Sequence, residues 1–383
     1  MKVKLKPGWK KVRFGDVVEL SKERSSDPEN DGFERFLGLE HMDPEDLKIR
    51  RWGDIVDGTT FTNVFRSGQV LFGKRRAYLR KVAIADFDGV CSGDIYVLQA
   101  KNNYLLPDLL PFICQSDSFF EHAIATSAGS LSPRTNWKSL AEYEFALPPI
   151  EEQNKLAKTF TLLSDVSQSY HNIYKRSRKL LESLVRYANY ECAFKDKVNE
   201  IFAINTSSLG NNNMSNDEML NYIDLSSITF PKGLVDMTPL KLSEAPSRAR
   251  RIVKNGDILI STVRPNLLGH TIIDTDTDKP MIASTGFTVL TPRNAYFSWL
   301  YIGFFWSEDF IHYCNSNVSG SAYPAINAES IADYKVPSLR WFDNSSYSDL
   351  FIKSSQSVVS TWKQYEKISK DLMPQIRREL LDL

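Results

Sequence analysis

One stretch of the sequence occurs twice, as residues 129–145 and 320–336, at a constant offset of 191. Both copies carry the pattern Gly-Ser-x-x-Pro-x-x-Asn and run towards a long polar segment of helical character. The identical pairs are Gly129/Gly320, Ser130/Ser321, Pro133/Pro324, Asn136/Asn327, Ser139/Ser330, Ala141/Ala332 and Tyr143/Tyr334. A fixed offset of this length indicates a duplicated unit rather than a short motif. A chain of 383 residues is long enough to give each unit its own core.

The two halves share further patterns that predict short strands. Residues 66–72 and 254–260 each place a basic residue, a glycine and a polar residue before an apolar triplet. This order is typical of a turn that leads into a buried strand. Further matched segments predict strands at 35–42 and 221–228 and at 89–98 and 281–290, and helices at 105–124 and 297–313. Each half is therefore expected to be an α+β globule.

Two other segments read as long helices. Residues 150–195 contain no Gly or Pro, and their apolar or small residues recur at alternating steps of four and three, the spacing of a coiled coil. The tail from Phe351 to Leu380 repeats this spacing, and Pro374 is expected to kink or break it. Each helix has one narrow apolar stripe and so needs a partner. The simplest partner is the other helix, packed antiparallel; the alternative is that each helix folds onto its own globule.

The predicted fold is α+β, with two similar globules separated by two long antiparallel coiled-coil helices and a pseudo-two-fold internal repeat. The expected boundaries are 1–149 for the first globule, 150–196 for the central helix, 197–342 for the second globule and 343–383 for the C-terminal helix. A helix of about 40 residues spans roughly 60 Å. The helix pair would therefore act as a spacer.

The sequence lacks the motifs of the common catalytic and cofactor sites. It has no Walker loop and no dinucleotide-binding glycine pattern, and its five histidines show no metal-ligand spacing. Residues 274–278 resemble a calcium loop but lack its glycine and glutamate, so they read as a solvated turn. We therefore expect a non-catalytic protein that binds neither cofactor nor metal. An unrecognised nuclease is the enzymatic alternative.

Composition limits the setting in which the protein works. The four cysteines lie far apart, which indicates reduced, mostly buried thiols. The N-terminal residues do not form a signal peptide, and no run of about 18 apolar residues could cross a membrane. The protein is therefore expected to be soluble and cytoplasmic. Lys+Arg and Asp+Glu both number 47, so a nucleic-acid binder would have to concentrate its cations locally.

Basic and polar residues do concentrate at matching places in the two halves. Residues 66–81 contain six cations and no acid, and arginines also recur in the second half at residues 248–264. Arginine and lysine neutralise phosphates, arginine and asparagine can read base edges, and small hydroxyls can approach a DNA backbone. The candidate DNA-binding residues are Lys74, Arg75, Arg76, Tyr78, Arg80, Lys81, Ser130, Ser132, Arg134, Asn136, Arg248, Arg250, Arg251, Arg264, Asn266, Ser321, Tyr323 and Asn327. Asn136 and Asn327 could instead be helix N-caps.

Taken in order, these motifs resemble those of the specificity subunits of type I restriction-modification systems over essentially the whole chain. The resemblance rests on Gly8-Trp-Lys-x-Val-x-Phe-Gly-Asp-Val-Val, the Gly68 and Gly256 turns, the paired Gly-Ser-x-x-Pro-x-x-Asn motifs, and residues 145–153, Phe-Ala-Leu-Pro-Pro-Ile-Glu-Glu-Gln. It implies two target-recognition domains that each read half of a bipartite double-stranded DNA site. It also implies two docked methyltransferase subunits that carry S-adenosylmethionine, and optional restriction subunits.

The second half departs from this pattern at its helix entry. Residues 336–344 contain neither the Pro-Pro nor the Glu-Glu-Gln element, so the sequence leaves open whether the second helix begins, and docks a methyltransferase, as the first does. Two alternatives remain open for the whole chain. One is the recognition subunit of a related phage-defence system with another catalytic partner. The other is a coiled-coil adaptor that binds no DNA.

Overall fold

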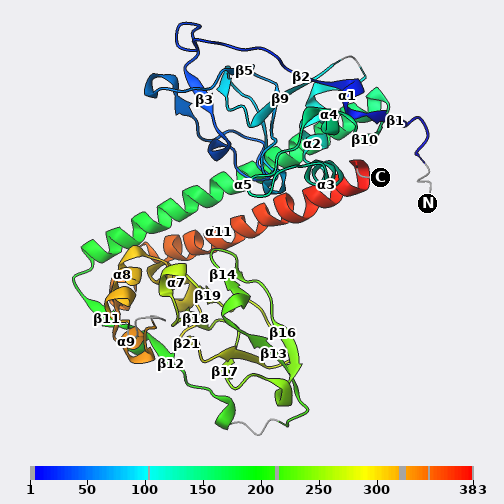
Figure 1. Cartoon of the computed structure of the whole chain (residues 1–383). Coiled ribbons are helices and arrows are strands. Elements are labelled where there is room, and N and C mark those ends of the chain that lie inside the picture. Colours follow the sequence, from blue (N-terminus) through cyan, green and yellow to red (C-terminus); the bar gives the residue numbers. More distant parts are fainter. Residues whose placement is uncertain (1–4, 102–103, 212–214, 319–324, 344–345, 382–383) are drawn as a thin grey trace. The chain divides into compact units, whose positions relative to one another are not determined.

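The chain folds into two compact units. The computed structural model describes residues 5–101, 104–211, 215–318, 325–343 and 346–381. The first unit comprises Met1–Val166 together with Lys367–Leu383, and the second comprises Ser167–Glu366 (Figure 1). The first unit is therefore assembled from two separate stretches of the chain, and the second unit from one continuous stretch.

The first unit contains two four-stranded sheets and a short strand pair. One sheet is antiparallel, in the order β2 (Val18–Leu20), β9 (Ile95–Ala100), β6 (Val70–Gly73) and β7 (Val82–Ile84). The other is mixed, in the order β4 (Gly53–Asp54), β3 (Arg35–Leu37), β8 (Gly89–Cys91) and β5 (Asn63–Phe65), with β3 and β8 parallel. The pair is β1 (Lys10–Arg13) with β10 (Glu144–Leu147).

Short helices of the first unit complete its core. They are α1 (Phe14–Val17), η1 (Leu39–His41), η2 (Ile55–Asp57), η3 (Ala77–Leu79), η4 (Pro107–Leu109), α2 (Leu110–Cys114), α3 (Asp117–Ala125) and α4 (Trp137–Ala141). Three fully buried aromatic rings join helices to sheet, because Phe119 of α3 lies 4.8 Å from Phe14 and 5.4 Å from Phe72 of β6, measured between ring centroids. These contacts fix α3 against the antiparallel sheet.

The second unit repeats this topology and adds one further strand pair. Its antiparallel sheet has the order β12 (Phe202–Ile204), β21 (Phe287–Pro292), β18 (Ile258–Ser261) and β19 (His270–Ile272). Its mixed sheet has the order β16 (Thr238–Lys241), β13 (Met219–Ile223), β20 (Met281–Ser284) and β17 (Ala249–Val253), with β13 and β20 parallel. The strand pairs are β11 (Lys195–Lys197) with β22 (Lys335–Pro337) and β14 (Ile228–Thr229) with β15 (Gly233–Leu234). The predicted internal repeat of α+β globules is confirmed.

The helices of the second unit follow the same plan. The short ones are α6 (Val198–Ile201), η5 (Leu209–Asn211), η6 (Leu225–Ser227), η7 (Leu242–Glu244), η8 (Pro265–Leu267), α7 (Phe297–Phe305), α8 (Glu308–Ser316), α9 (Ala328–Asp333) and α10 (Leu339–Asp343). Buried aromatic rings again join sheet to helix, with Phe202 of β12 lying 6.0 Å from Tyr301 of α7. The four cysteines of the chain are buried and unpaired, as predicted.

The long helices pack against each other in the antiparallel sense that the sequence predicts. Helix α5 (Ile150–Glu191) passes from the first unit into the second, where its later part meets α11 (Ser348–Glu366). As residue numbers rise along α5 they fall along α11. The successive contacts are Tyr174 with Trp362 (4.8 Å between ring centroids), Ser177 Oγ with Ser357 Oγ (2.8 Å), and Tyr187 with Tyr347 (5.4 Å between ring centroids).

These helices also pack onto the second globule, which the simplest coiled-coil model did not include. Phe351 of α11 stacks on Phe304 of α7 with ring centroids 5.5 Å apart. Gly303 of α7 makes room for α5, because a Cβ at that position would lie 2.8 Å from Leu181 Cδ1. The apolar stripes are therefore shared between the partner helix and the globule, so the structure combines the two arrangements that the sequence left open.

The C-terminal helical segment is irregular near Pro374, as predicted. A π-helical segment, η9 (Lys367–Leu372), follows α11 and precedes α12 (Met373–Leu381). Proline has no N–H to donate and its ring clashes with the preceding turn, so the regular hydrogen-bond ladder is interrupted there. No helix among the described residues is long and apolar enough to span a membrane.

The two long helices begin differently, at the position where the second half of the sequence departs from the pattern of the first. At the start of α5, the Gln153 side chain is buried, accepts from Leu106 N (2.9 Å) and donates to Tyr104 O (2.7 Å) and Pro148 O (2.9 Å). Glu152 accepts from Trp9 Nε1 at 2.9 Å. The second half lacks these residues and instead forms the short helix α10 before α11 begins at Ser348.

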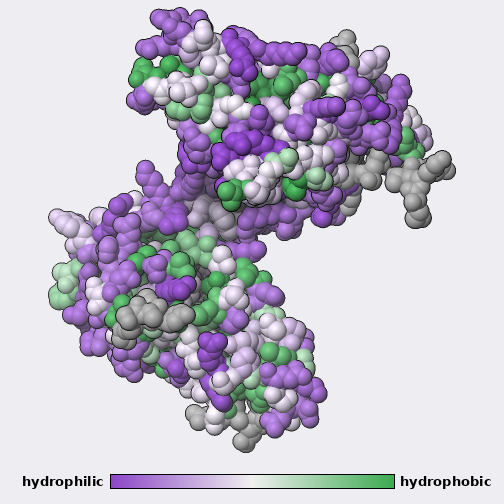
Figure 2. Space-filling view, in the orientation of Figure 1, coloured by the Kyte–Doolittle hydropathy of each residue, from purple (hydrophilic) through white to green (hydrophobic). Residues whose placement is uncertain are grey.

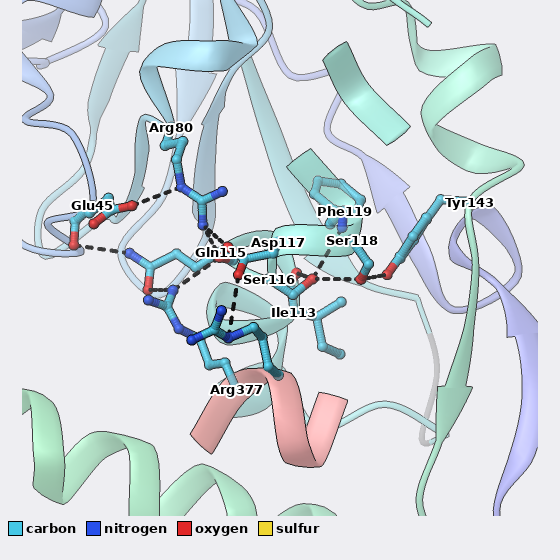
Figure 3. Close-up of polar contacts among 11 residues, drawn as sticks. Glu45, Arg80, Ile113, Gln115, Ser116, Asp117, Ser118, Phe119, Tyr143 and Arg377 are labelled. Carbon is cyan, nitrogen blue, oxygen red and sulfur yellow. Dashed lines mark hydrogen bonds and ion pairs between the residues drawn. The ribbon is translucent and has the colours of Figure 1, made fainter. Parts of the chain in front are cut away.

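A buried arginine ties α12 to the body of the first unit (Figure 3). Arg377 is only 4% exposed, and its Nη1 donates to the carbonyl oxygen and to Oε1 of Gln115, both at 3.0 Å. Gln115 is also held by Arg80 Nη2, which donates to its carbonyl at 3.0 Å, and by Glu45, whose carbonyl accepts from Nε2 at 3.3 Å. The C-terminal residues are therefore part of the first unit.

We expect Arg377→Ala to destabilise the first unit by about 2 kcal/mol, because it removes one of the two donors to the Gln115 carbonyl and leaves the buried Oε1 of Gln115 without the donor that Arg377 supplies. The measurement is amide hydrogen exchange of α2 and α3 in the intact chain. The neighbouring Arg378→Ala is the control: its side chain is 61% exposed and lies 3.9 Å from Asp117, so its removal should change protection little. Equal losses of protection in both variants would contradict the assigned role of Arg377.

Candidate functional site

The basic run and the duplicated motif, which are far apart in the sequence, are adjacent in the first unit. Residues 74–76 follow β6 and pair with residues 133–135 through backbone hydrogen bonds. Thr135 N donates to Lys74 O at 3.0 Å, and Arg76 N donates to Pro133 O at 2.7 Å. Both segments thus form one surface at the end of β6, which we call the basic loop site: residues 74–78 and 129–136.

The motif itself forms a closed turn. Ala128 and Arg134 exchange two backbone hydrogen bonds, of 3.0 and 2.9 Å. Gly129 has a φ of +110°, a conformation that side-chain-bearing residues rarely adopt, which explains the glycine. Ser130 is exposed, and Leu131 at the tip is 88% exposed. The turn is fixed at its base while its tip is open to solvent.

Three arginines of this site are held by two polar side chains. Arg134 makes a bidentate contact with Asp94, with Nε–Oδ1 at 2.7 Å and Nη2–Oδ2 at 3.2 Å. Arg75 Nη1 donates to Asp94 Oδ2 at 3.4 Å, and its Nη2 donates to Ser132 Oγ at 3.1 Å. Arg76 Nη2 also donates to Ser132 Oγ, at 3.3 Å. The hydrogen bonds from Arg134, and then the charges of both arginines, hold the pKa of Asp94 below its usual range.

The remaining residues of the predicted basic run have different environments. Lys74 lies over the Tyr96 ring at 4.7 Å, and Tyr78 is 52% exposed. Arg80 forms ion pairs with Glu45 (2.8 Å) and Asp117 (2.7 Å), and Lys81 Nζ donates to Leu39 O at 2.7 Å. Arg80 and Lys81 therefore serve internal contacts of the first unit, whereas Lys74, Arg75, Arg76 and Tyr78 belong to the basic loop site.

The second unit contains an equivalent loop after β18. Val263 forms a backbone bridge with Ala325, and Ile326 N donates to Thr262 O at 2.9 Å. Arg264 has a φ of +48° and Arg76 of the first unit a φ of +54°, and in both cases a short 3₁₀-helix follows. Left-handed backbone is costly for non-glycine residues and tends to persist at functional positions. The repeat therefore places an arginine in the same uncommon conformation in both units.

The other predicted residues of the second unit flank this loop. Arg264 and Asn266 are exposed. Arg248 directly precedes β17, and its carbonyl accepts from Thr285 N at 2.8 Å. The carbonyl of Gly286, the residue after Thr285, accepts from Thr262 N at 2.9 Å. Arg250 is exposed and donates to Ser247 O, whereas Arg251 is half-buried. Ser321 and Tyr323 lie outside the described residues.

Asn136 and Asn327 are helix N-caps. Asn136 Oδ1 accepts from Ser139 N at 2.9 Å at the start of α4, and Asn327 Oδ1 accepts from Ser330 N at 2.7 Å at the start of α9. The asparagine of the duplicated motif is thus explained by local structure in both copies. In the first unit, helix α4 and strand β10 lie between the motif and the long helix α5.

Some residues near the site were not anticipated from the sequence. Lys22 and Arg24 are exposed and line a polar pocket of about 580 Å³ together with Lys74 and Tyr96. The sequence places both cations in a charged loop that has no visible link to residue 74. Their proximity depends on the pairing of β2 with β9, and Asp94 likewise reaches the site only through the β8–β9 turn. The exposed faces of both units in Figure 2 are mainly hydrophilic, with scattered apolar patches.

Known proteins share this fold and sequence pattern. Residues 6–176 match the family model of the type I restriction modification DNA specificity domain. The specificity subunit of the type I restriction enzyme EcoDI of Escherichia coli is 27% identical over 188 residues, which cover 47% of this chain and 41% of that protein. The alignment thus spans about two fifths of the curated relative.

Solved structures resemble the chain over nearly its whole length. The S subunit of a type I restriction-modification system from M. genitalium is 16% identical and superposes with a TM-score of 0.60, covering 99% of this chain and 96% of that one. The HsdS subunit of Thermoanaerobacter tengcongensis is 20% identical, with a TM-score of 0.43 and coverage of 100% and 99%. The repeated α+β units with two long packed helices have the fold of such subunits. Residues 6–176 are thus similar to a type I restriction modification DNA specificity domain, and the chain shares the fold of the M. genitalium S subunit.

We expect Asn136→Ala to destabilise the first unit by about 1 kcal/mol through loss of the cap, whereas Asn136→Ser should retain most of its stability. Urea unfolding of the two variants beside the parent chain measures the difference. Equal stability of the alanine and serine variants would show that the side chain does not act as a cap.

Proposed function

We propose that this chain is the DNA-recognition subunit of a type I restriction-modification complex and that each unit reads one half of a bipartite site. The proposal rests on the basic loop that recurs in both units. In each unit, an arginine with left-handed backbone, Arg76 or Arg264, lies where the end of a strand pairs with the duplicated motif. The match of residues 6–176 to a DNA specificity domain supports the same function. Two similar readers on one chain suit two half-sites separated by about one turn of DNA.

The side chains of the basic loop site have the chemistry that DNA recognition needs. Arg76 and Arg134 are exposed arginines that can pair with phosphates or with guanine O6 and N7. Lys22, Arg24 and Lys74 border one pocket and are suited to holding the phosphate backbone in register. In the second unit, Arg248, Arg264 and Asn266 supply the equivalent groups. The chain as a whole has 47 cations and 47 anions, so this local concentration supports a specific surface over a general attraction to polyanions.

The long helices set the distance between the half-sites and dock the catalytic partners. Two methyltransferase subunits, which carry S-adenosylmethionine, bind along the helices, and restriction subunits join through them. The different helix entries, with Gln153 at α5 and α10 before α11, make the two docking positions unequal. The chain itself contributes recognition and no chemistry to the reaction.

We expect the double variant Arg75→Glu/Arg76→Glu to weaken binding of the assembled complex to its target by about 100-fold, because two phosphate- or base-binding cations become repulsive. Discrimination at the second half-site should remain intact. Equilibrium binding to duplexes with either half-site altered measures both effects. Subunit assembly, followed by gel filtration, should not change.

The matched control is Lys101→Glu, which reverses an exposed charge of the same unit outside the basic loop site. It should bind within a few-fold of the parent complex. If the double variant also discriminates normally at both half-sites, the assignment of Arg75 and Arg76 to DNA recognition is wrong.

Sequencing of DNA methylation in cells with and without this gene tests the function as a whole. We expect an asymmetric, gapped methylated motif to disappear when the gene is removed, because methylation at that site depends on the recognition subunit. DNA binding without any lost motif would favour a related defence system with another catalytic partner. Absence of both would favour an adaptor that binds no DNA.

A further inference from the structure

We propose that Asp94 is a positioning residue for DNA recognition by the first unit: its carboxylate fixes the guanidinium groups of Arg75 and Arg134, and thereby sharpens discrimination at one half-site. The inference rests on the proposed function and adds to it an acidic specificity determinant on a surface that binds a polyanion. It also assigns different modes of recognition to the two units.

The carboxylate is built into the fold rather than free to move. Asp94 lies in the β8–β9 turn, where its N donates to Ser92 Oγ at 3.2 Å and its carbonyl accepts from Lys74 N at 3.0 Å. Its side chain is 19% exposed, whereas those of Arg75 and Arg134 are 38% and 48% exposed. A largely buried acid thus contacts two cations that are more exposed.

The contacts leave the arginines able to act on a ligand. Arg134 uses Nε and Nη2 for its fork with Asp94, so Nη1 is not engaged by the carboxylate. Arg75 is held at both ends of its guanidinium, by Asp94 and by Ser132, and Ser132 in turn contacts Arg76. One carboxylate and one hydroxyl therefore order three arginines. Because these side chains lose little further rotamer freedom on binding, the complex gains geometric selectivity.

The negative charge of Asp94 opposes DNA binding, so removing it is expected to have two effects on affinity that can be measured separately. A negative charge beside DNA phosphates weakens binding to every sequence alike. Ordered arginine forks, in contrast, favour only the base pairs whose acceptors match their geometry. The two effects move specific and non-specific affinity in opposite directions when the charge is removed, so they can be separated experimentally.

Among the residues of the second unit that the structure describes, no carboxylate occupies the equivalent position. Gly286 takes the place of Asp94, because its carbonyl accepts from Thr262 N at 2.9 Å just as the Asp94 carbonyl accepts from Lys74 N. A glycine offers no carboxylate, so Asp94 has no counterpart at the equivalent position beside Arg264. The first unit should therefore be the more selective reader, and the effect of changing Asp94 should be confined to its half-site.

The test is Asp94→Asn in the assembled complex, with binding measured to four duplexes: the methylated motif, the motif with its first half altered, the motif with its second half altered, and unrelated DNA. We expect affinity for unrelated DNA to rise a few-fold as a negative charge is lost. The preference for the correct half-site of the first unit should fall by about tenfold. Discrimination at the other half-site should not change. Asp94→Glu, which retains the charge, should restore part of the preference.

Asp88→Asn is the matched control, because it removes the same charge from an exposed carboxylate of the same unit that pairs with Arg66. It should leave the preference between half-sites unchanged. A rise in specific and non-specific affinity by the same factor in Asp94→Asn would overturn the inference, as would loss of discrimination at both half-sites. Absence of any sequence preference in the parent complex would instead refute the proposed function.

Discussion

Backbone pairing between the end of a strand and a distant turn is the constraint on which the proposed recognition surface depends. In the first unit the pairing joins residues 74–76 to 133–135, and in the second it joins Thr262 and Val263 to Ala325 and Ile326. These hydrogen bonds satisfy the main chain of both loops, so the side chains are free to face solvent and ligand. Because peptide geometry rather than side-chain identity makes the pairing, the loop residues can vary while the scaffold stays the same.

A second layer of interactions sorts the cations by role. Arg75, Arg76 and Arg134 share Ser132 and Asp94 at the surface, whereas Arg80 is taken up by Glu45, Asp117 and the carbonyl of Gln115. Arg80 therefore supports the α2–α3 junction that Arg377 also contacts, whereas the neighbouring arginines lie at the surface. A run of like charges in sequence thus divides into residues with internal contacts and proposed DNA-binding residues only four positions apart.

The sequence predicted those features that recur with a fixed period or offset. The duplication, the Gly68 and Gly256 turns, and the buried stripe of α5 all follow from such spacing, and Pro374 marks an irregular helix for a purely local reason. Residues brought together by non-local pairing were not predictable. Asp94, Lys22 and Arg24 lie near Lys74 because strands pair, and nothing in their own neighbourhoods indicates it. The division of the basic run into residues with internal contacts and residues at the surface was unpredictable for the same reason, since Glu45 and Asp117 are remote in sequence from Arg80.

The first unit is assembled from two separate stretches of the chain, and this affects its folding during synthesis. Residues 167–366 form the second unit as one continuous segment, whereas the first unit includes Lys367–Leu383. Segments fold as they emerge during synthesis. The second unit can therefore complete its fold while the first still lacks the helix that carries Arg377. The first unit, which begins the chain, is thus completed only when the segment from Lys367 onward has been synthesised.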